Sequence, residues 1–241
     1  MELSAKNEHK QLSFPVDPET DKLRLNYSLL ISEIQELDAS KSELEKIIYE
    51  FGVRHDQELG ALILAILKFR KEETKGTQFE TQTKSEYDEF FSSYESSKNK
   101  KINILNDSDQ KELKDKYRKA SKLCHPDVVD ESLKETAHQI FTALNNAYKD
   151  NDLISVTRIL ESLESGNSLI NKTKKLSEKE FLLAEIERLA KHIEYLKLEI
   201  EELLNSTIYQ KIISISNLDT YFENARKELL KQITELEDGG E

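Results

Sequence analysis

The sequence predicts an all-α protein in which a central helical hairpin is flanked by long coiled-coil helices. The chain has 241 residues with only six glycines and three prolines, and Pro15 and Pro18 leave Pro126 as the sole proline of the remaining body. A chain so poor in turn formers is expected to be mostly helical. Hydrophobic residues make up 37% and charged residues 34%, a balance that suits elongated helices with a large surface.

The N-terminal part divides into a tail and a heptad-patterned region. Residues 1–20 are polar and carry both early prolines, so they are expected to form a flexible tail. Residues 21–75 are expected to form a helical, coiled-coil region, because apolar residues alternate there at the spacings of a heptad repeat. Those residues are Leu23, Tyr27, Leu30, Ile34, Leu37, Leu44, Ile48 and Phe51. Gly52 is expected to end or bend this helix, and the apolar stretch Leu59–Phe69 to be well buried.

The next segment, residues 76–107, is expected to be a linker. It begins with Gly76 and is mostly polar. Four aromatic residues within it have amphipathic spacing and predict a short aromatic helix. They are Tyr87, Phe90, Phe91 and Tyr94.

The C-terminal segment, residues 166–241, carries the most regular heptads. Its seam is formed by Leu182, Ile186, Leu189, Ile193, Leu196, Ile200 and Leu203. Isoleucine at every a position and leucine at every d position favours a two-stranded parallel coiled coil. Two arrangements stay open: a homodimer through the Leu182–Leu203 heptads, which the pattern favours, and an intramolecular pairing. A final helix is expected from Leu218 to Leu236.

Between these regions, residues 108–165 are expected to form a compact helical unit. Apolar residues at helical spacing predict helices over Ser108–Cys124, Glu131–Tyr148 and Leu153–Leu163. Asp130 and Asp152 are placed to cap the second and third of these helices.

The first helix of this unit is basic and ends at a proline. Between Lys111 and Lys122 there are six basic residues against two acidic ones, in a chain of net charge −12. A basic helical face suits docking onto an acidic protein surface. Pro126 forces the helix to stop, so His125 and Asp127 are expected to be displayed on a stiff turn. Both side chains are able to form charge-assisted hydrogen bonds with a partner.

This segment resembles the J-domain family of Hsp70 co-chaperones. The resemblance rests on the Tyr117-Arg118 pair, the eight-residue step to His125-Pro126-Asp127, and Phe141 followed by Leu144-Asn145-Asn146-Ala147-Tyr148. Several elements in register make the match more specific than any one tripeptide. The family's first short helix is not recognisable, and Tyr87–Tyr94 would supply it only across a long loop. The chain looks closer to bacterial proteins that embed one J-like unit between coiled-coil helices.

The resemblance implies binding to a DnaK-type Hsp70 and stimulation of its ATPase. The residues that it implicates are His125, Pro126 and Asp127 as the essential loop, and Tyr117, Arg118, Lys119, Lys122 and Lys114 as the docking face. The ATPase site belongs to the partner, so the chain itself is expected not to be an enzyme and to need no cofactor. The coiled-coil arms would hold a client or an assembly partner that the sequence does not name.

A second class of function stays open: a structural adaptor whose J-like unit no longer engages Hsp70. Other classes are disfavoured. The acidic net charge argues against nucleic acid, and the longest apolar run, Ala61–Leu67, is far shorter than the roughly 20 residues that span a bilayer. The single cysteine, Cys124, excludes an internal disulfide and a cysteine-based metal cluster. Since Met1–Lys10 shows no signal peptide, a cytoplasmic location is expected.

Overall fold

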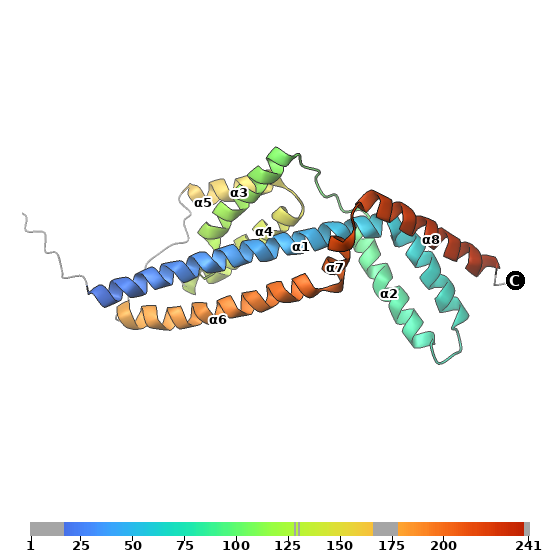
Figure 1. Cartoon of the computed structure of the whole chain (residues 1–241), viewed down its shortest axis with the longest axis horizontal. Coiled ribbons are helices and arrows are strands. Elements are labelled where there is room, and N and C mark those ends of the chain that lie inside the picture. Colours follow the sequence, from blue (N-terminus) through green and yellow to red (C-terminus); the bar gives the residue numbers. More distant parts are fainter. Residues whose placement is uncertain (1–16, 128, 130, 166–177, 239–241) are drawn as a thin grey trace, which may run out of the picture.

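The computed structural model describes residues 17–127, 129, 131–165 and 178–238. Within these residues the chain forms helices and no strand, which confirms the all-α prediction (Figure 1). The elements are α1 (Pro18–Glu73), α2 (Glu80–Ser97), α3 (Asp107–Cys124), a 3-10 turn η1 (Glu131–Leu133), α4 (Lys134–Lys149), α5 (Leu153–Glu164), α6 (Glu178–Asn205), α7 (Thr207–Ser214) and α8 (Leu218–Asp238).

Helix α1 is the spine of the molecule, and the other elements lie along it (Figure 1). It begins earlier than the sequence suggested, because the Asp17 side chain accepts a hydrogen bond from the Glu19 N–H and Pro18 takes the first helical position. Residues 18–20 therefore belong to the helix, and the rest of the predicted tail lies outside the described residues. The helix does not end at Gly52 but continues to Glu73, and Figure 1 shows its distal part turning in a new direction.

Helix α6 runs parallel to the first half of α1 (Figure 1). The seam residues Leu189, Ile193 and Leu196 are buried against Ile34 and its neighbours on α1. Ion pairs link the two helices in the same order along both of them, from Arg24–Glu178 at 2.7 Å to Lys41–Glu199 at 2.9 Å. The parallel geometry that the Ile/Leu pattern favours is thus formed within one chain. A homodimer through the same seam would require this pair to separate.

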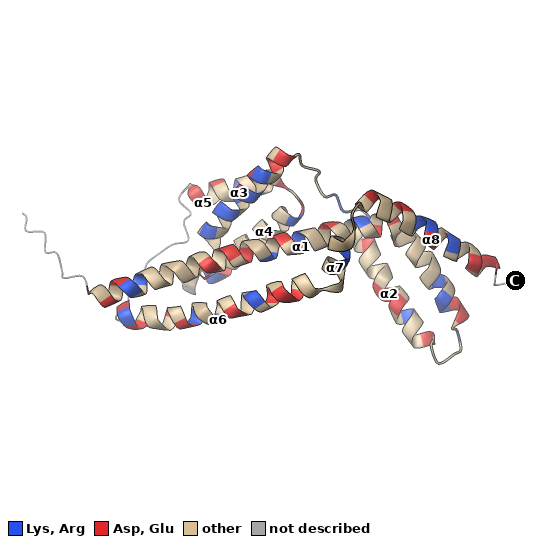
Figure 2. Ribbon diagram, viewed as in Figure 1, with Lys and Arg blue, Asp and Glu red and all other residues tan. Residues whose placement is uncertain are grey.

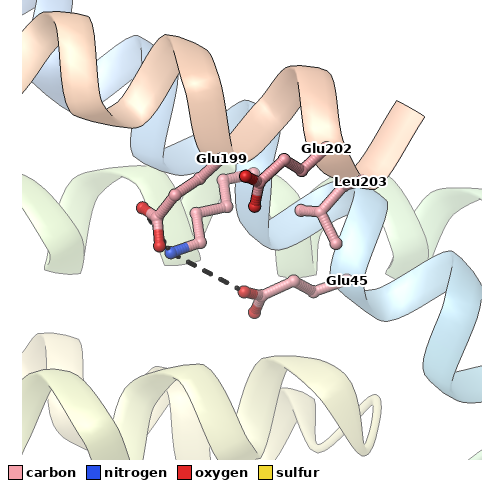
Figure 3. Close-up of a pocket in the computed structure, with 5 residues that line it drawn as sticks. Glu45, Glu199, Glu202 and Leu203 are labelled. Atoms are coloured by element: carbon pink, nitrogen blue, oxygen red, sulfur yellow. Dashed lines mark hydrogen bonds and ion pairs between the residues drawn. The ribbon is translucent and has the colours of Figure 1, made fainter. Parts of the chain in front are cut away.

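A second contact between α1 and α6 lies where the paired region ends. Lys41 Nζ also lies 3.9 Å from Glu45 Oε1 on its own helix, so the lysine bridges carboxylates of both helices (Figure 3). Together with Glu202 and Leu203 these residues line a shallow hollow between the helices. The bridge fixes the register of α6 on α1 at this point.

The predicted linker contains a full helix. Helix α2 folds back along the distal part of α1 after a turn in which Gly76 has φ of 75° (Figure 1). The two helices approach closely at Gly60, where an added Cβ would lie 2.4 Å from Cδ2 of Tyr94. Tyr94 thus packs α2 against α1 in a helical hairpin. Helix α2 has 18 residues and is longer than the short helix that was expected.

The C-terminal helices return to the distal part of α1. Phe222 of α8 is buried with Phe51 and Leu59 of α1, and Ile212 of α7 packs against the same cluster. Helix α8 confirms the final helix predicted from Leu218. Helix α7 was not predicted from the sequence. It is capped by Ser206, whose side chain accepts a hydrogen bond from the Tyr209 N–H.

Helices α3, α4 and α5 share one hydrophobic core on the other side of α1. It is formed by Leu113, Tyr117, Ala120, Cys124, Val129, Ala137, Leu144, Tyr148, Val156, Leu160 and Leu163. The predicted cap of the third helix is confirmed, since the Asp152 side chain accepts a hydrogen bond from the Ser155 N–H. The second helix differs from the prediction, because a 3-10 turn precedes α4, and the predicted cap Asp130 lies outside the described residues.

Candidate functional site

The site is built on α3 and the turn that follows it. Asn106 caps the start of α3 by accepting a hydrogen bond from the Asp109 N–H. The helix stops at Cys124 because Pro126 disfavours helical geometry in the residue before it, and His125 accordingly has φ of −63° and ψ of 128°. The turn thus starts where the sequence placed it, between α3 and α4.

Tyr117 was expected on the docking face, and the structure places it in the core instead. Its ring is 1% exposed and stacks on Tyr148 at a centroid distance of 4.1 Å. Its hydroxyl donates to Asn145 Oδ1 at 2.7 Å, which leaves the Ser42 hydroxyl on α1 to donate to Tyr117 at 2.7 Å. Burial raises the pKa of Tyr117 above its ordinary value. Tyr117 therefore joins the helical unit to α1 and does not face a partner.

The four basic residues predicted for the docking face divide into two groups. Lys114 lies 3.1 Å from Glu43 and Arg118 lies 3.8 Å from Glu36, both on α1. Lys119 and Lys122 are exposed and make no ion pair within the described part of the chain. Figure 2 shows the basic residues along α3 and the acidic residues along the adjacent stretch of α1. About half of the predicted docking face is thus already opposed by carboxylates of the same chain.

His125 is buried rather than displayed. Its side chain is 5% exposed, and its ring meets Phe141 edge-on at a centroid distance of 5.2 Å. The Asp127 backbone N–H donates to His125 Nδ1 at 3.1 Å, so this nitrogen carries a lone pair. The proton then lies on Nε2, which donates to Asp38 Oδ2 on α1 at 2.6 Å. Both ring nitrogens are therefore engaged within the chain.

Asp127 is held by helix α6. Arg188 Nη1 donates to Asp127 Oδ1 at 2.7 Å, and His192 Nδ1 donates to Oδ2 at 2.5 Å. Burial by itself raises the pKa of Asp127, but the hydrogen bonds from His192 and Arg188 outweigh it and hold that pKa well below the ordinary value. The same bond to Asp127 raises the pKa of His192. The carboxylate is thus ionised and satisfied by two donors from one helix.

The prediction that the turn presents His125 and Asp127 to solvent is therefore wrong in this structure. The side chain of Asp127 is 12% exposed, and Pro126 between the two is half-buried. The physical reason is that α1 and α6 supply a carboxylate and two cationic donors at the positions where a partner would have to supply them. We refer to Asp38, Arg188 and His192 as the loop clasp.

Sequence reasoning missed the clasp residues and the acidic residues of α1 near them. Glu36, Glu43 and Glu50 recur every seven residues, which puts them on one face of α1. Glu43 also accepts a hydrogen bond from the Tyr148 hydroxyl at 2.7 Å, and Glu50 accepts one from the Asn151 amide at 2.8 Å. The regular glutamates were a readable signal for a basic helix to pack there. No comparable signal marked Arg188 and His192, which look like ordinary surface residues beside the heptad seam.

Residues Tyr87–Tyr94, which would supply the family's first helix only across a long loop, do not take its place. Helix α2 contacts α1 and none of α3, α4 or α5. Instead the middle of α1 packs against α3 and α4. The long helix α1 therefore covers the face of the hairpin that the sequence left without a partner.

The described residues do not form a metal site, a reactive cysteine or a membrane-spanning helix. No group of three or more His, Cys, Asp and Glu side chains is arranged to hold a metal ion there. Burial raises the pKa of Cys124 to about 12, so its thiol is a core group rather than a nucleophile. No helix in the described ranges is long and apolar enough to cross a membrane.

Comparison with known families identifies the helical unit. A model of the DnaJ domain matches residues 100–150, which span α3, the turn with His125, Pro126 and Asp127, and α4. No curated protein and no solved structure matches the chain. The matched segment contains the basic helix α3, the turn with His125, Pro126 and Asp127, and helix α4. The chain therefore carries a DnaJ domain at residues 100–150.

Proposed function

We propose that this protein is a co-chaperone that binds a DnaK-type Hsp70 through its DnaJ domain and stimulates ATP hydrolysis by that partner. The observation that carries the proposal is the DnaJ match itself, with His125, Pro126 and Asp127 intact at the end of a basic helix. The protein would act on the partner's ATPase site and would not be an enzyme in its own right. A cytoplasmic location belongs to the same proposal.

The exposed basic residues support an encounter with an acidic partner. Lys119 and Lys122 project from α3 next to the turn, and Arg118 is only partly engaged by Glu36 at 3.8 Å. Surface charges of this kind speed association and orient the partner, and their effect falls with salt. The basic group therefore suits a first contact that precedes engagement of His125 and Asp127.

The arms would recruit the Hsp70 to a client or an assembly. The hairpin of α1 and α2 and the helices α7 and α8 carry large apolar side chains that are exposed in the single chain. They include Phe79, Phe91, Ile208, Ile213, Leu218 and Leu230. Exposed apolar residues of this size are typical of surfaces that contact other proteins.

The experiment that tests the proposal measures the affinity of the full-length protein for ATP-loaded Hsp70. Lys119→Glu with Lys122→Glu should weaken binding roughly tenfold or more at low salt, because two favourable charges become unfavourable. The matched control is Lys227→Glu with Lys231→Glu, an equal charge change on α8 that should leave the affinity unaltered. The proposal fails if neither pair of substitutions changes the affinity. It also fails if Hsp70 binds neither the wild type nor the variants Arg188→Ala with His192→Ala and Ile193→Asp.

A second candidate function is a structural adaptor in which the DnaJ domain is a fixed packing unit. The burial of His125 and Asp127 favours it, because a permanently covered turn has no use as a docking site. Under this alternative, Ile193→Asp with Leu196→Asp in the α1–α6 seam would abolish function in cells, whereas His125→Gln would not. Complementation of a deletion strain with each variant separates the two.

A further inference from the structure

We propose that helix α6 is a removable cover of the DnaJ domain: Arg188 and His192 hold Asp127, and Hsp70 reaches this carboxylate only after α6 leaves it, while His125 stays on Asp38 of α1. This inference rests on the proposed function and concerns the regulation of the same site. In the closed state that the structure describes, His125 is 4% exposed and each polar atom of its ring has a partner.

The chemistry of the clasp matches what an Hsp70 contact would have to offer. Asp127 is a largely buried carboxylate that needs strong donors, and α6 provides a guanidinium and an imidazole. A partner therefore binds Asp127 only by replacing the Arg188 and His192 hydrogen bonds with donors of its own. Lys114 and Arg118 likewise form ion pairs with Glu43 and Glu36. Helix α1 thus supplies the acidic surface against which the basic helix α3 packs.

The packing allows α6 to leave without unfolding the DnaJ domain. The core of α3, α4 and α5 contains no residue of α1 or α6. The apolar contact of α6 is a separate cluster with α1, built on Ile34, Leu189, Ile193 and Leu196. No element-level contact links α6 to α3, α4 or α5, so Asp127 is the point at which the cover holds the domain. Separate cores permit one contact to open while the other persists.

The expected size of the effect follows from the populations of the two states. A binding site that is accessible only in a minor state has its apparent affinity reduced by the fraction of that state. If closed molecules dominate, removing the clasp should raise stimulation at subsaturating protein by roughly three- to tenfold. The wild type retains a low activity from its open fraction.

The experiment compares full-length variants in single-turnover ATP hydrolysis by a bacterial DnaK-type Hsp70. Arg188→Ala with His192→Ala removes the donors from Asp127. The matched control, Glu187→Ala with Lys191→Ala, removes an exposed ion pair of 2.7 Å from the outer face of the same helix. Far-UV circular dichroism checks that each variant keeps its helices.

A second variant that opens the protein by another contact shows whether the clasp substitutions act only by distorting the turn. Ile193→Asp weakens the α1–α6 seam without touching the turn, and it should raise stimulation as the clasp variant does. The inference is overturned if wild type, clasp variant and seam variant all stimulate Hsp70 equally, an outcome that leaves the proposed function intact. If none of them binds or stimulates any Hsp70 tested, the proposed function itself fails and the adaptor stands.

Discussion

At the scale of single residues, the structure of the site depends on the hydrogen-bond partners of two largely buried polar side chains. His125 and Asp127 lie beside each other in the turn, yet they are held by different helices, Asp38 on α1 and Arg188 with His192 on α6. A buried carboxylate without donors is costly, so each donor contributes strongly to the position of α6. The turn is therefore a junction between three parts of the chain as well as a docking motif.

The titration of His192 reports this junction directly. Asp127 and Asp38 face the imidazole and favour its charged form, and Arg188 opposes it; the net effect raises its pKa. Because the pKa is higher in the closed than in the open state, the stabilisation by His192 is complete below its ordinary pKa. It is lost as the pH rises through the raised value.

We expect the ring signals of His192 in an NMR titration to show a midpoint above the roughly 6.5 of an unperturbed histidine. Asp127→Asn should bring the midpoint back towards that value, because the largest favourable partner is gone. His192→Gln identifies the signal among the five histidines. Equal midpoints in wild type and Asp127→Asn would contradict the contact.

Tyr117 gives a second prediction at this scale. Tyr117→Phe removes a buried hydroxyl that serves Asn145 as donor and Ser42 as acceptor, and leaves both of them unpaired. The free energy of unfolding should fall by about 1–3 kcal/mol, as measured by urea denaturation. Tyr195→Phe, at a side chain that is 58% exposed, is the control and should change it little. An equal loss of unfolding free energy in both variants would show that the Tyr117 hydroxyl does not link the helical unit to α1.

At the scale of elements, α1 decides the arrangement by offering a different partner along each part of its length. Its first half pairs with α6, its middle packs against α3 and α4, and its distal part holds α2 and α8. The two glycines of its distal half have opposite roles. Gly52 has open space around the position of a Cβ, whereas Gly60 lies against the ring of Tyr94.

Alanine at each glycine should therefore change stability in opposite directions. Gly52→Ala should stabilise the protein by about 0.5–1 kcal/mol, because alanine loses less backbone entropy in a helix. Gly60→Ala has the same intrinsic gain, but its methyl group would overlap Tyr94 and force α1 and α2 apart. Thermal denaturation of the two variants checks the signs, and a stabilising Gly60→Ala would refute the close approach.

The periodic elements could be predicted from the sequence, because burial follows apolar spacing. The seam from Leu182 to Leu203 and the core of α3 and α4 are examples. The partner of the seam could not be predicted, since an Ile/Leu pattern sets strand number and direction but does not say whether the second strand is the same chain. The motif at His125 could also be recognised. Its burial could not, because Asp38 and Arg188 lie 87 and 61 residues away from the turn residues that they hold.

At the scale of the whole molecule, three hydrophobic clusters are strung along one spine. The DnaJ core, the α1–α6 cluster and the distal cluster of Phe51, Leu59 and Phe222 share no buried residue. Units that pack separately are able to open separately. Helix α7 contacts both α1 and α6, and so lies between the distal arms and the cover of the turn.

The most direct measurement of the central claim is single-turnover ATP hydrolysis by a DnaK-type Hsp70 with the Arg188→Ala/His192→Ala protein, with and without His125→Gln. We expect the opened protein to stimulate hydrolysis, and His125→Gln to remove the stimulation while the helical signal is retained. Stimulation that survives His125→Gln would contradict the claim that this turn is the point of contact with Hsp70.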